Sequence, residues 1–471
     1  MSTPTDDIDA ALTAVGPIDG RYRARTRALV DYFSEYALIR YRVRIEIEWY
    51  LFLSDTAGFD ALAPIDQTTR DHLRAIHRNF TLADARRIKE IEAVANHDVK
   101  AVEYFLREKF AAIDPALPLE AIHFACTSED ISNLAWALMI REFVENILQP
   151  ALATTVGTLG EMARRFKSAA MIARTHGQAA TPTTMGKELA VFAARLERQL
   201  VRLERQEYLG KFSGAVGNFN AHVAAYPEID WIEVSRRFVE GFGLVWNPLT
   251  TQIESHDFIA EICDLMVRIA TVTLGFTRDV WAYVSLGYFR QRPVAGEVGS
   301  STMPHKVNPI DFENAEGNLG VASALFAHLG TKLPVSRWQR DLSDSTAMRS
   351  IGTAFGHVVI ALDSIRRGLR RLELDEARLA LDIDDDHALE VVSEAIQTVM
   401  RRHNLDQPYE RLKEITRGRP FDRHALHDFV AKLPLDARTR KKLAALSPRS
   451  YLGLADILVE RYAPRRPTGK V

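Results

Sequence analysis

The sequence contains little cysteine, since Cys126 and Cys263 are the only two among 471 residues and they lie far apart. Two distant thiols exclude a disulfide framework and a cysteine-based zinc ribbon or finger. Long uninterrupted apolar runs are also lacking, because Asp264 and Arg268 break the run that follows Ile259, so we expect no membrane-spanning helix. The N-terminal sequence is acidic and lacks a long apolar segment, so we expect no signal peptide.

An excess of charge of either sign is absent too, because 60 Lys and Arg residues face 62 Asp and Glu residues, giving a net charge of -2. A chain this close to neutral is not expected to be a general nucleic-acid binder, so an anion site must come from local clusters of Arg and Lys. The hydrophobic share of 47% excludes wholesale disorder. Together with the scarce thiols, these features predict a cytoplasmic protein of about three domains.

What the sequence does contain is helical periodicity. Apolar residues recur at every third or fourth position, as Leu189, Leu196 and Leu203 do, which is typical of amphipathic helices. The segments predicted in this way are 132–166, 186–209, 257–289, 316–331 and 352–373. Sustained alternation is rare, so we predict an all-α fold with a central bundle of long helices. These helices have more apolar surface than one chain covers, so we expect subunits to pack helix against helix.

Changes in composition along the chain predict domain boundaries. Prolines 115 and 118 follow the first helical region, and an acidic segment at 374–386 precedes the last one. We therefore expect an N-terminal helical domain over 1–117, a central long-helix bundle over 118–373 and a C-terminal helical domain over 374–471. The basic, proline-containing tail at 463–471 is expected to be frayed.

The segment 291–309 interrupts the helical pattern. It reads QRPVAGEVGSSTMPHKVNP, with three prolines, two glycines, two adjacent serines and no apolar stripe. Loops of this length are usually functional lids or disordered segments. A solvated connector is the plainer interpretation, but serines beside His305 and Lys306, framed by glycines, favour a mobile catalytic loop.

Several short polar segments allow both a structural and a functional interpretation. His97-Asp98 is typical of a capped turn. Thr127-Ser128, followed by acidic residues, is typical of a helix N-terminus, which can also bind an anion. His176 before a glycine fits a buried, hydrogen-bonded loop histidine as well as a reactive one. None of these segments decides the function alone.

Two further features have plain structural interpretations. Arg340 and Arg349 fit surface ion pairs with Asp341 and Asp344, which would contribute little. Cys126 fits a small buried hydrophobe. The combination of these residues with the polar segments and the loop is what calls for an explanation.

Residues 299–309, GSSTMPHKVNP, resemble the signature loop of the fumarase/aspartase superfamily, GSSxMPxKxNP, which is long and specific. Other segments resemble one family within it, the adenylosuccinate lyases of the longer bacterial type. They are PIDGRY at 17–22, NHDVKAVEYF at 96–105, HFACTSEDISNLA at 123–135, RTHGQ at 174–178, GAVGNFNAH at 214–222, TTQIESHD at 250–257, DFENAEGN at 311–318 and KLPVSRWQRDLSDST at 332–346. The resemblance covers about 13–460 and departs at Ala179-Ala180, where the family usually has Pro-Ala.

The resemblance implies an elimination that releases fumarate, from adenylosuccinate to give AMP and from SAICAR to give AICAR, in purine nucleotide biosynthesis. It implies Ser300 as general base, His176 as general acid toward the leaving nitrogen, Lys306 as the cation beside the base and His97 as a supporting residue. A base and an acid each contribute typically about 10²–10⁴ in rate. The carbanion adds charge beside an existing carboxylate, which fixed cations and N–H donors must stabilise. We expect no cofactor and no metal.

The implied substrate is a small nucleotide with a phosphate and two carboxylates. The resemblance assigns its nucleotide and phosphate contacts to Arg21, Tyr22, Arg340, Ser345 and Arg349. It assigns its carboxylate contacts and their surroundings to Thr127, Ser128, Ser301, Lys306, Asn308, Gln252 and Asn314, with Asn96 and Asp98 beside His97. Sites in this superfamily are assembled from three subunits of a homotetramer, so we expect active sites shared between subunits. We expect neither a nucleic-acid nor a membrane partner.

Other functions are left open by the residues themselves. Another fumarate-releasing lyase, such as argininosuccinate lyase or aspartase, would share the serine loop, although the PIDGRY, NHD and SRWQRDLSDST segments favour the nucleotide substrate. A metal-dependent phosphohydrolase built on His97-Asp98 and His256-Asp257 lacks a completing ligand spacing. A non-catalytic helical scaffold is disfavoured by the presence of Ser300, Lys306 and His176 together.

Overall fold

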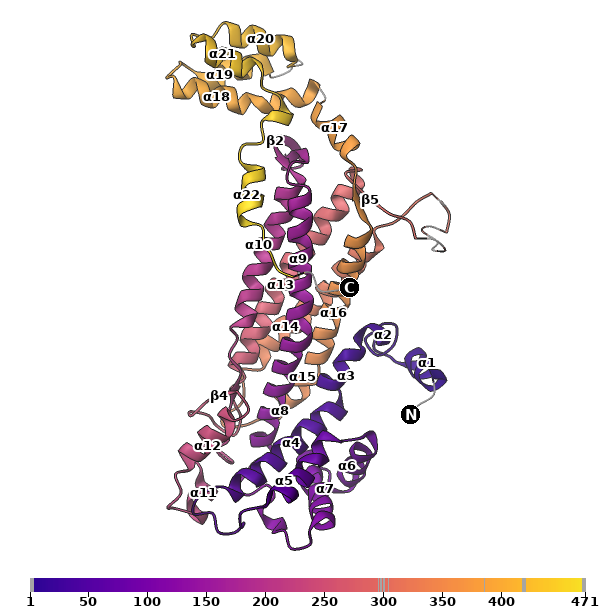
Figure 1. The fold of residues 1–471 in the computed structure, drawn as a ribbon, viewed down its shortest axis with the longest axis vertical. Coiled ribbons are helices and arrows are strands. Elements are labelled where there is room, and N and C mark those ends of the chain that lie inside the picture. Colours follow the sequence, from indigo (N-terminus) through magenta and orange to yellow (C-terminus); the bar gives the residue numbers. More distant parts are fainter. Residues whose placement is uncertain are drawn as a thin grey trace. The chain divides into compact units, whose positions relative to one another are not determined.

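A computed structural model of the chain describes residues 4–294, 296, 299, 301–303, 305–384, 386–416 and 421–467. It confirms the all-α prediction (Figure 1), because helices dominate and the strands of the described residues form only three two-stranded sheets. No helix within these residues is long and apolar enough to cross a membrane.

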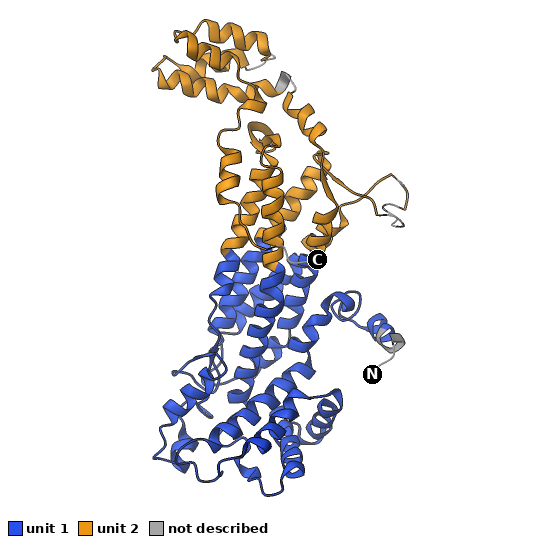
Figure 2. Cartoon of the chain, viewed as in Figure 1, with its two compact units in different colours: residues 1–151, 199–271, 317–363 blue, residues 152–198, 272–316, 364–471 orange. Residues whose placement is uncertain are grey.

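The chain divides into two compact units (Figure 2). Unit 1 comprises residues 1–151, 199–271 and 317–363, and unit 2 comprises residues 152–198, 272–316 and 364–471. Five long helices contribute residues to both units: α9 (Gln149–Arg165), α10 (Met185–Glu204), α13 (Asp257–Ser285), α14 (Ile310–Lys332) and α16 (Ile351–Arg371). The boundaries expected after residues 117 and 373 stay a prediction.

The long helices follow the predicted periodicity closely. The segment predicted at 257–289 is α13, and those predicted at 186–209 and 352–373 are α10 and α16. The segment predicted at 132–166 is α8 (Ser128–Phe143) and α9, joined by a π-helical turn, η3 (Val144–Leu148). A π-turn inserts a residue into the helical ladder, which the apolar spacing did not indicate.

Unit 1 contains the N-terminal helices and two short strands. The remaining elements are α1 (Pro4–Thr13), α2 (Arg23–Thr26), η1 (Arg27–Leu29), α3 (Val30–Phe33), α4 (Glu35–Ser54), α5 (Gln67–Arg78), α6 (Leu82–Ala95), α7 (Asp98–Ile113), η2 (Leu119–Ala121), β3 (Leu209–Gly210), α11 (Asn220–Ala225), α12 (Trp231–Glu240), β4 (Val245–Trp246) and α15 (Ser343–Met348). Its core includes Trp49, whose ring centroid lies 4.4 Å from that of Phe212 and 4.9 Å from that of Phe238. Such edge-on and tilted aromatic packing adds stability beyond burial alone.

Unit 2 contains an antiparallel hairpin and the C-terminal helices. Its remaining elements are β1 (Ala170–Thr175), β2 (Gln178–Thr184), β5 (Phe289–Gln291), β6 (Leu372–Leu374), α17 (Glu376–Asp384), η4 (Asp386–Val392), α18 (Ser393–Arg402), α19 (Pro408–Thr416), α20 (Arg423–Ala431), α21 (Ala437–Ala444), η5 (Pro448–Ser450) and α22 (Ala455–Tyr462). A buried apolar cluster that includes Leu389, Ile396 and Leu426 holds the C-terminal helices together.

The expectation of a frayed tail is wrong for its described part, residues 463–467. The tail packs on α9, where the backbone oxygen of Pro464 would lie 2.3 Å from a Cβ added at Gly160. Arg164 Nη1 donates to the same oxygen at 2.9 Å, and Arg466 Nε lies 3.0 Å from Glu197 Oε1. A residue without Cβ lets two backbones approach closely. Gly160 on α9 therefore allows the tail to pack against the helix, which the composition of the tail alone does not indicate.

Candidate active site

The N-terminus of α8 is built around Asp130. Thr127 caps the helix in a capping box with Asp130, and its backbone N–H donates to Asp130 Oδ2 at 2.8 Å. This confirms the helix start predicted at Thr127-Ser128. Asp130 also accepts from the backbone N–H of Ser213 at 2.9 Å and from Lys211 Nζ at 2.9 Å, in a fully buried ion pair. The pair joins the loop after β3, which carries Lys211, to the start of α8, which carries Asp130. Separating them would leave two buried charges unpaired, so the pair fixes the loop at this position.

Gln252 is placed by the same loop. Its Nε2 donates to the carbonyl oxygen of Ala215 at 3.0 Å. Gly217 has φ +82°, and a Cβ added there would lie 2.2 Å from the Thr250 oxygen, so the loop requires glycine at this point. Thr127 and Gln252 thereby belong to one hydrogen-bonded framework in unit 1, and Ser128 follows Thr127 as the first residue of α8.

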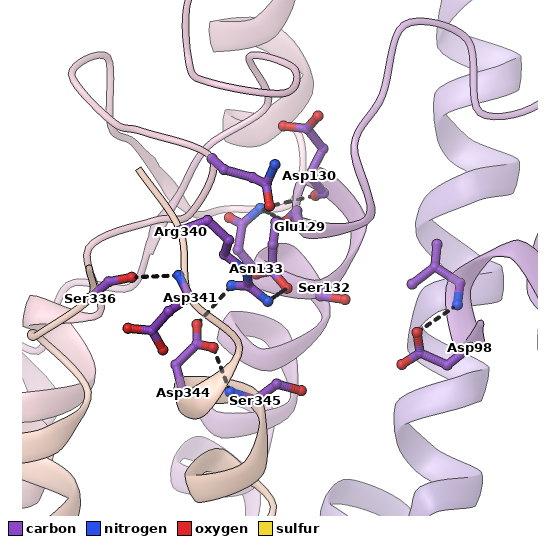
Figure 3. Close-up of polar contacts among 12 residues, drawn as sticks. Asp98, Glu129, Asp130, Ser132, Asn133, Ser336, Arg340, Asp341, Asp344 and Ser345 are labelled. Carbon is purple, nitrogen blue, oxygen red and sulfur yellow. Dashed lines mark hydrogen bonds and ion pairs between the residues drawn. The ribbon is translucent and has the colours of Figure 1, made fainter. Parts of the chain in front are cut away.

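Arg340 lies between two carboxylates, Glu129 at the start of α8 and Asp344 on α15 (Figure 3). Its Nη2 is 3.0 Å from Glu129 Oε1 and its Nη1 is 2.8 Å from Asp344 Oδ2. The Arg340 side chain is 17% exposed, so its ion pairs are not the surface pairs expected from the sequence. The sequence did not indicate Glu129 as one of its partners. Burial raises the pKa of Glu129 despite the neighbouring Arg340. A mostly buried guanidinium beside a helix N-terminus is suited to bind an anion.

Asp344 connects Arg340 to a buried histidine. His256 Nε2 lies 3.2 Å from Asp344 Oδ2. The backbone N–H of Ser345 donates to Asp344 Oδ1 at 2.6 Å (Figure 3). Burial acts to raise the pKa of Asp344, but the hydrogen bond from His256 and the charge of Arg340 outweigh it and lower that pKa. His256 therefore pairs with Asp344 rather than with the adjacent Asp257.

His97, Asp98 and Arg349 form a second group in unit 1, and Figure 3 draws Asp98 apart from Arg340. His97 caps α7, with its Nδ1 accepting from the backbone N–H of Lys100 at 3.2 Å, which confirms the capped turn. Asp98 lies 2.7 Å from Arg42 Nη1 and 3.9 Å from Arg349 Nη2. Burial acts to raise the pKa of Asp98, and the Arg42 guanidinium outweighs it, so the net shift is downward.

The other candidates of unit 1 are more exposed. Arg349 also pairs with Glu35 at the start of α4. Asn96 ends α6 in the left-handed conformation with φ 52°, a position that favours asparagine. Arg21 is exposed in the turn before α2, and the Arg25 guanidinium lies 5.7 Å from the ring centroid of Tyr22.

His176 stands at the tip of the β1–β2 hairpin in unit 2. Thr175 pairs with Gln178, so His176 and Gly177 form a two-residue turn with φ values of 53° and 78°. A type I′ hairpin turn requires positive φ at both central positions, which glycine adopts readily and histidine more often than most other residues. The His176 side chain is exposed, so the structure does not support a buried loop histidine.

Serine 300, the predicted base, lies outside the described residues. Around it, Ser301 and Lys306 are exposed. Asn308 Nδ2 donates to the carbonyl oxygen of Gly299 at 3.1 Å, and a Cβ at Gly299 would lie 2.4 Å from the Lys306 oxygen. Asn308 therefore ties the two ends of this stretch together. On α14, Asn314 Oδ1 accepts a hydrogen bond at 2.7 Å from the hydroxyl of Ser364, which lies on α16.

Each unit thus gathers part of the predicted set. Unit 1 holds Arg21, Tyr22, Asn96, His97, Asp98, Thr127, Ser128, Gln252, Arg340, Ser345 and Arg349. Unit 2 holds His176, Ser301, Lys306, Asn308 and Asn314.

Cys126 is only partly buried, and burial raises the pKa of its thiol. Among the described residues, no three His, Cys, Asp or Glu side chains are arranged to hold a metal ion.

Comparison with known families assigns the class. A family model described as Lyase matches residues 20–323, and one described as Adenylosuccinate lyase C-terminal matches residues 336–452. The chain is a lyase of the fumarase/aspartase superfamily.

Relatives then give the particular family. An adenylosuccinate lyase from Vibrio cholerae is 49% identical over 454 residues, covering 96% of this chain and 99% of the relative. One from Escherichia coli K12 is 48% identical over 452 residues, with the same coverage. The chain belongs to the adenylosuccinate lyase family.

Solved structures of similar fold include two more distant proteins. The 3-carboxy-cis,cis-muconate lactonizing enzyme from Pseudomonas putida aligns with a TM-score of 0.73 at 21% identity, covering 93% of this chain and 97% of that one. A fumarate lyase from Mesorhizobium sp. BNC1 has the same TM-score and coverage at 18% identity. At these identities the likeness establishes the fold alone.

Proposed function

We propose that this chain eliminates fumarate from adenylosuccinate, giving AMP, and from SAICAR, giving AICAR, as part of purine nucleotide biosynthesis. The observation that carries the proposal is the contact of Arg340 with Glu129, 3.0 Å away, because Glu129 follows Thr127 and Ser128 at the start of α8. A guanidinium and a helix N-terminus together offer an anion both charge and N–H donors. The substrate carries a phosphate and two carboxylates, so it requires such sites.

The reaction needs one base and one acid and no other reactant. The base removes a proton from the carbon beside a carboxylate, the C–N bond on the neighbouring carbon breaks, and the acid protonates the nitrogen that leaves. Ser300 is the proposed base, with Lys306 as the cation that favours its alkoxide form. His176 is the proposed acid, because a protonated imidazole can donate a proton to the leaving nitrogen and its exposed ring at a hairpin tip is accessible to a substrate. His97 is a supporting residue.

The proposed binding residues form two groups according to the part of the substrate that they contact. We assign nucleotide and phosphate contacts to Arg21, Tyr22, Arg340, Ser345 and Arg349. We assign carboxylate contacts and their surroundings to Thr127, Ser128, Ser301, Lys306, Asn308, Gln252, Asn314, Asn96 and Asp98. Arg340 already has two carboxylate partners, so binding of an anion there exchanges an internal ion pair for one with the substrate.

We further propose a cytoplasmic homotetramer whose active sites are shared between subunits. Large apolar residues are exposed on long helices: Val191 on α10, Trp281 on α13 and Val321 on α14 are 39%, 48% and 47% exposed. Apolar surface of this kind on helices favours helix packing between copies of the chain. Sharing would also enclose His176, which its own unit leaves exposed.

The direct test is turnover of adenylosuccinate by the purified protein without added metal or cofactor. AMP and fumarate are expected in equal amounts, measured by chromatography. Argininosuccinate, aspartate and malate serve as parallel substrates. Turnover of one of these instead would assign another fumarate-releasing activity, and no turnover of any would favour the scaffold alternative.

A further inference from the structure

Both strands of the hairpin that carries His176 are attached to the C-terminal part of unit 2. Within the described residues no hydrogen bond or ion pair holds the His176 ring, so its position depends on the hairpin backbone. An isolated two-stranded hairpin is only marginally stable, so its orientation depends on what packs against it. Here α17 packs on β1, while η4 and η5 pack on β2.

Asp382 on α17 contacts one hydroxyl and two guanidinium groups. The Tyr288 hydroxyl donates to Asp382 Oδ2 at 2.8 Å, and Arg378 Nη2 lies 2.9 Å from Oδ1. Arg174 Nη2 lies 3.6 Å from Oδ2, and Arg174 stands two residues before His176 on β1. The Asp382 side chain is 18% exposed, whereas the Arg174 and Arg378 side chains are 37% and 44% exposed, so solvent still screens the two ion pairs in part.

Apolar contacts and β2 complete the attachment. Ile172 of β1 packs with Ile383 and Ala388 in a small buried cluster. The register of the β1–β2 pair shifts between Ile172 and Ala173. Ile172 pairs with Pro182 and Ala173 pairs with Ala180, so Thr181 is the extra residue of a β-bulge. Proline has no N–H for the ladder, which favours a bulge at this point. The freed Thr181 hydroxyl donates to Glu394 Oε2 at 2.5 Å.

We propose that Asp382 is a positioning residue for the reaction: by holding Arg174 against α17 it fixes the hairpin tip and the direction in which His176 delivers its proton. The inference rests on the proposed function of His176. It gives the C-terminal segment of unit 2 a part in the chemistry, although Asp382 itself touches no reacting atom.

The test is Asp382→Asn, which keeps the side-chain volume and removes the charge. Backbone amides of residues 173–180 should exchange hydrogen faster, while the rest of unit 2 keeps its wild-type rates. The kcat should fall about tenfold and KM should stay within about twofold, because a misdirected acid affects the transition state more than binding. Asp382→Glu, which keeps the carboxylate, should recover most of the lost kcat.

Asp384→Asn is the matched control. Asp384 lies on the same helix, and its Oδ2 is 2.7 Å from Arg449 Nη2 of η5 rather than from a residue of the hairpin strands. The two side chains are 55% and 53% exposed, so this pair contributes little. It should change neither the hairpin exchange nor kcat. Thr181→Val, which removes the bond from β2 to Glu394, should loosen the same amides to a smaller extent.

The proposal would be overturned by unchanged hairpin exchange in Asp382→Asn, by faster exchange with an unchanged kcat, or by an equal loss in Asp384→Asn. Faster exchange throughout unit 2 would assign Asp382 to general stability and would overturn it as well. Hydrogen exchange reports on the attachment without any turnover, so an inactive wild-type protein would refute the proposed function and leave the attachment itself measurable.

Discussion

Arg340 in unit 1 and His176 in unit 2 are held in opposite ways. Arg340 is mostly buried between Glu129 and Asp344, and Asp344 in turn contacts His256. His176 is exposed, and the two positive φ angles of a tight turn hold it in place. Arg340, a proposed binding residue, therefore has charged partners before a substrate arrives. The groups proposed to react in unit 2 depend on backbone geometry and, in the proposed tetramer, on enclosure by other copies of the chain.

This contrast separates two kinds of defect. Loss of a group in unit 2 that acts only in the transition state should lower kcat and leave binding intact. Loss of a charged partner in unit 1 should weaken binding, because the remaining buried charges are left without compensation.

The largest effect is expected from Ser300→Ala, which removes the proposed base of unit 2. The kcat should fall by about 10⁴, the upper range for a general base, while the affinity for adenylosuccinate stays measurable. Steady-state kinetics and calorimetric binding give the two quantities. A variant that keeps more than a few per cent of wild-type kcat would show that another residue is the base.

A smaller effect is expected from Arg340→Ala in unit 1. The kcat/KM should fall about 10²-fold, mainly through KM, because the anion loses its guanidinium and two carboxylates lose their partner. Arg337→Ala is the matched control: its side chain is 85% exposed and its Nη1 lies 3.8 Å from Asp341, so kcat/KM should stay within about twofold. Equal losses in the two variants would contradict a specific role for Arg340.

The smallest effect concerns acid stability in unit 1. His222 is buried, both ring nitrogens lack a hydrogen-bond partner among the described residues, and burial lowers its pKa to about 4. In the unfolded chain His222 is protonated below about pH 6.5, whereas in the folded chain it is protonated only below about pH 4. Its contribution to the free energy of unfolding is therefore fully present above pH 6.5 and is lost as the pH falls toward 4. Between pH 7 and pH 5 the wild type should lose about 2 kcal/mol of unfolding free energy that His222→Phe does not lose. Urea unfolding of the two proteins at both pH values measures this difference, and identical losses would disprove it.

Much of the fold could be predicted from the sequence, because the buried face of a long amphipathic helix appears as apolar residues at every third or fourth position. The segment predicted at 257–289 is the helix Asp257–Ser285. The β1–β2 hairpin was missed, since its strands are short and the two-residue turn at His176-Gly177 has no Asn-Gly signal. The docked tail was missed because Gly160, which makes room for it, is some 300 residues away in sequence.

The candidate residues could be found through a resemblance, but their partners could not. Glu129 is 211 residues from Arg340, and Lys211 is 81 residues from Asp130. Arg42 pairs with Asp98 from a different helix. Pairing at such separations depends on tertiary packing, which residue spacing does not encode.

The most direct measurement mixes two inactive variants, Ser300→Ala and His176→Ala, after subunit exchange. If the active sites of a homotetramer are shared as proposed, some sites in the mixture combine an intact Ser300 from one subunit with an intact His176 from another. We predict that turnover of adenylosuccinate then reappears. No recovery after verified subunit exchange would contradict the shared active site.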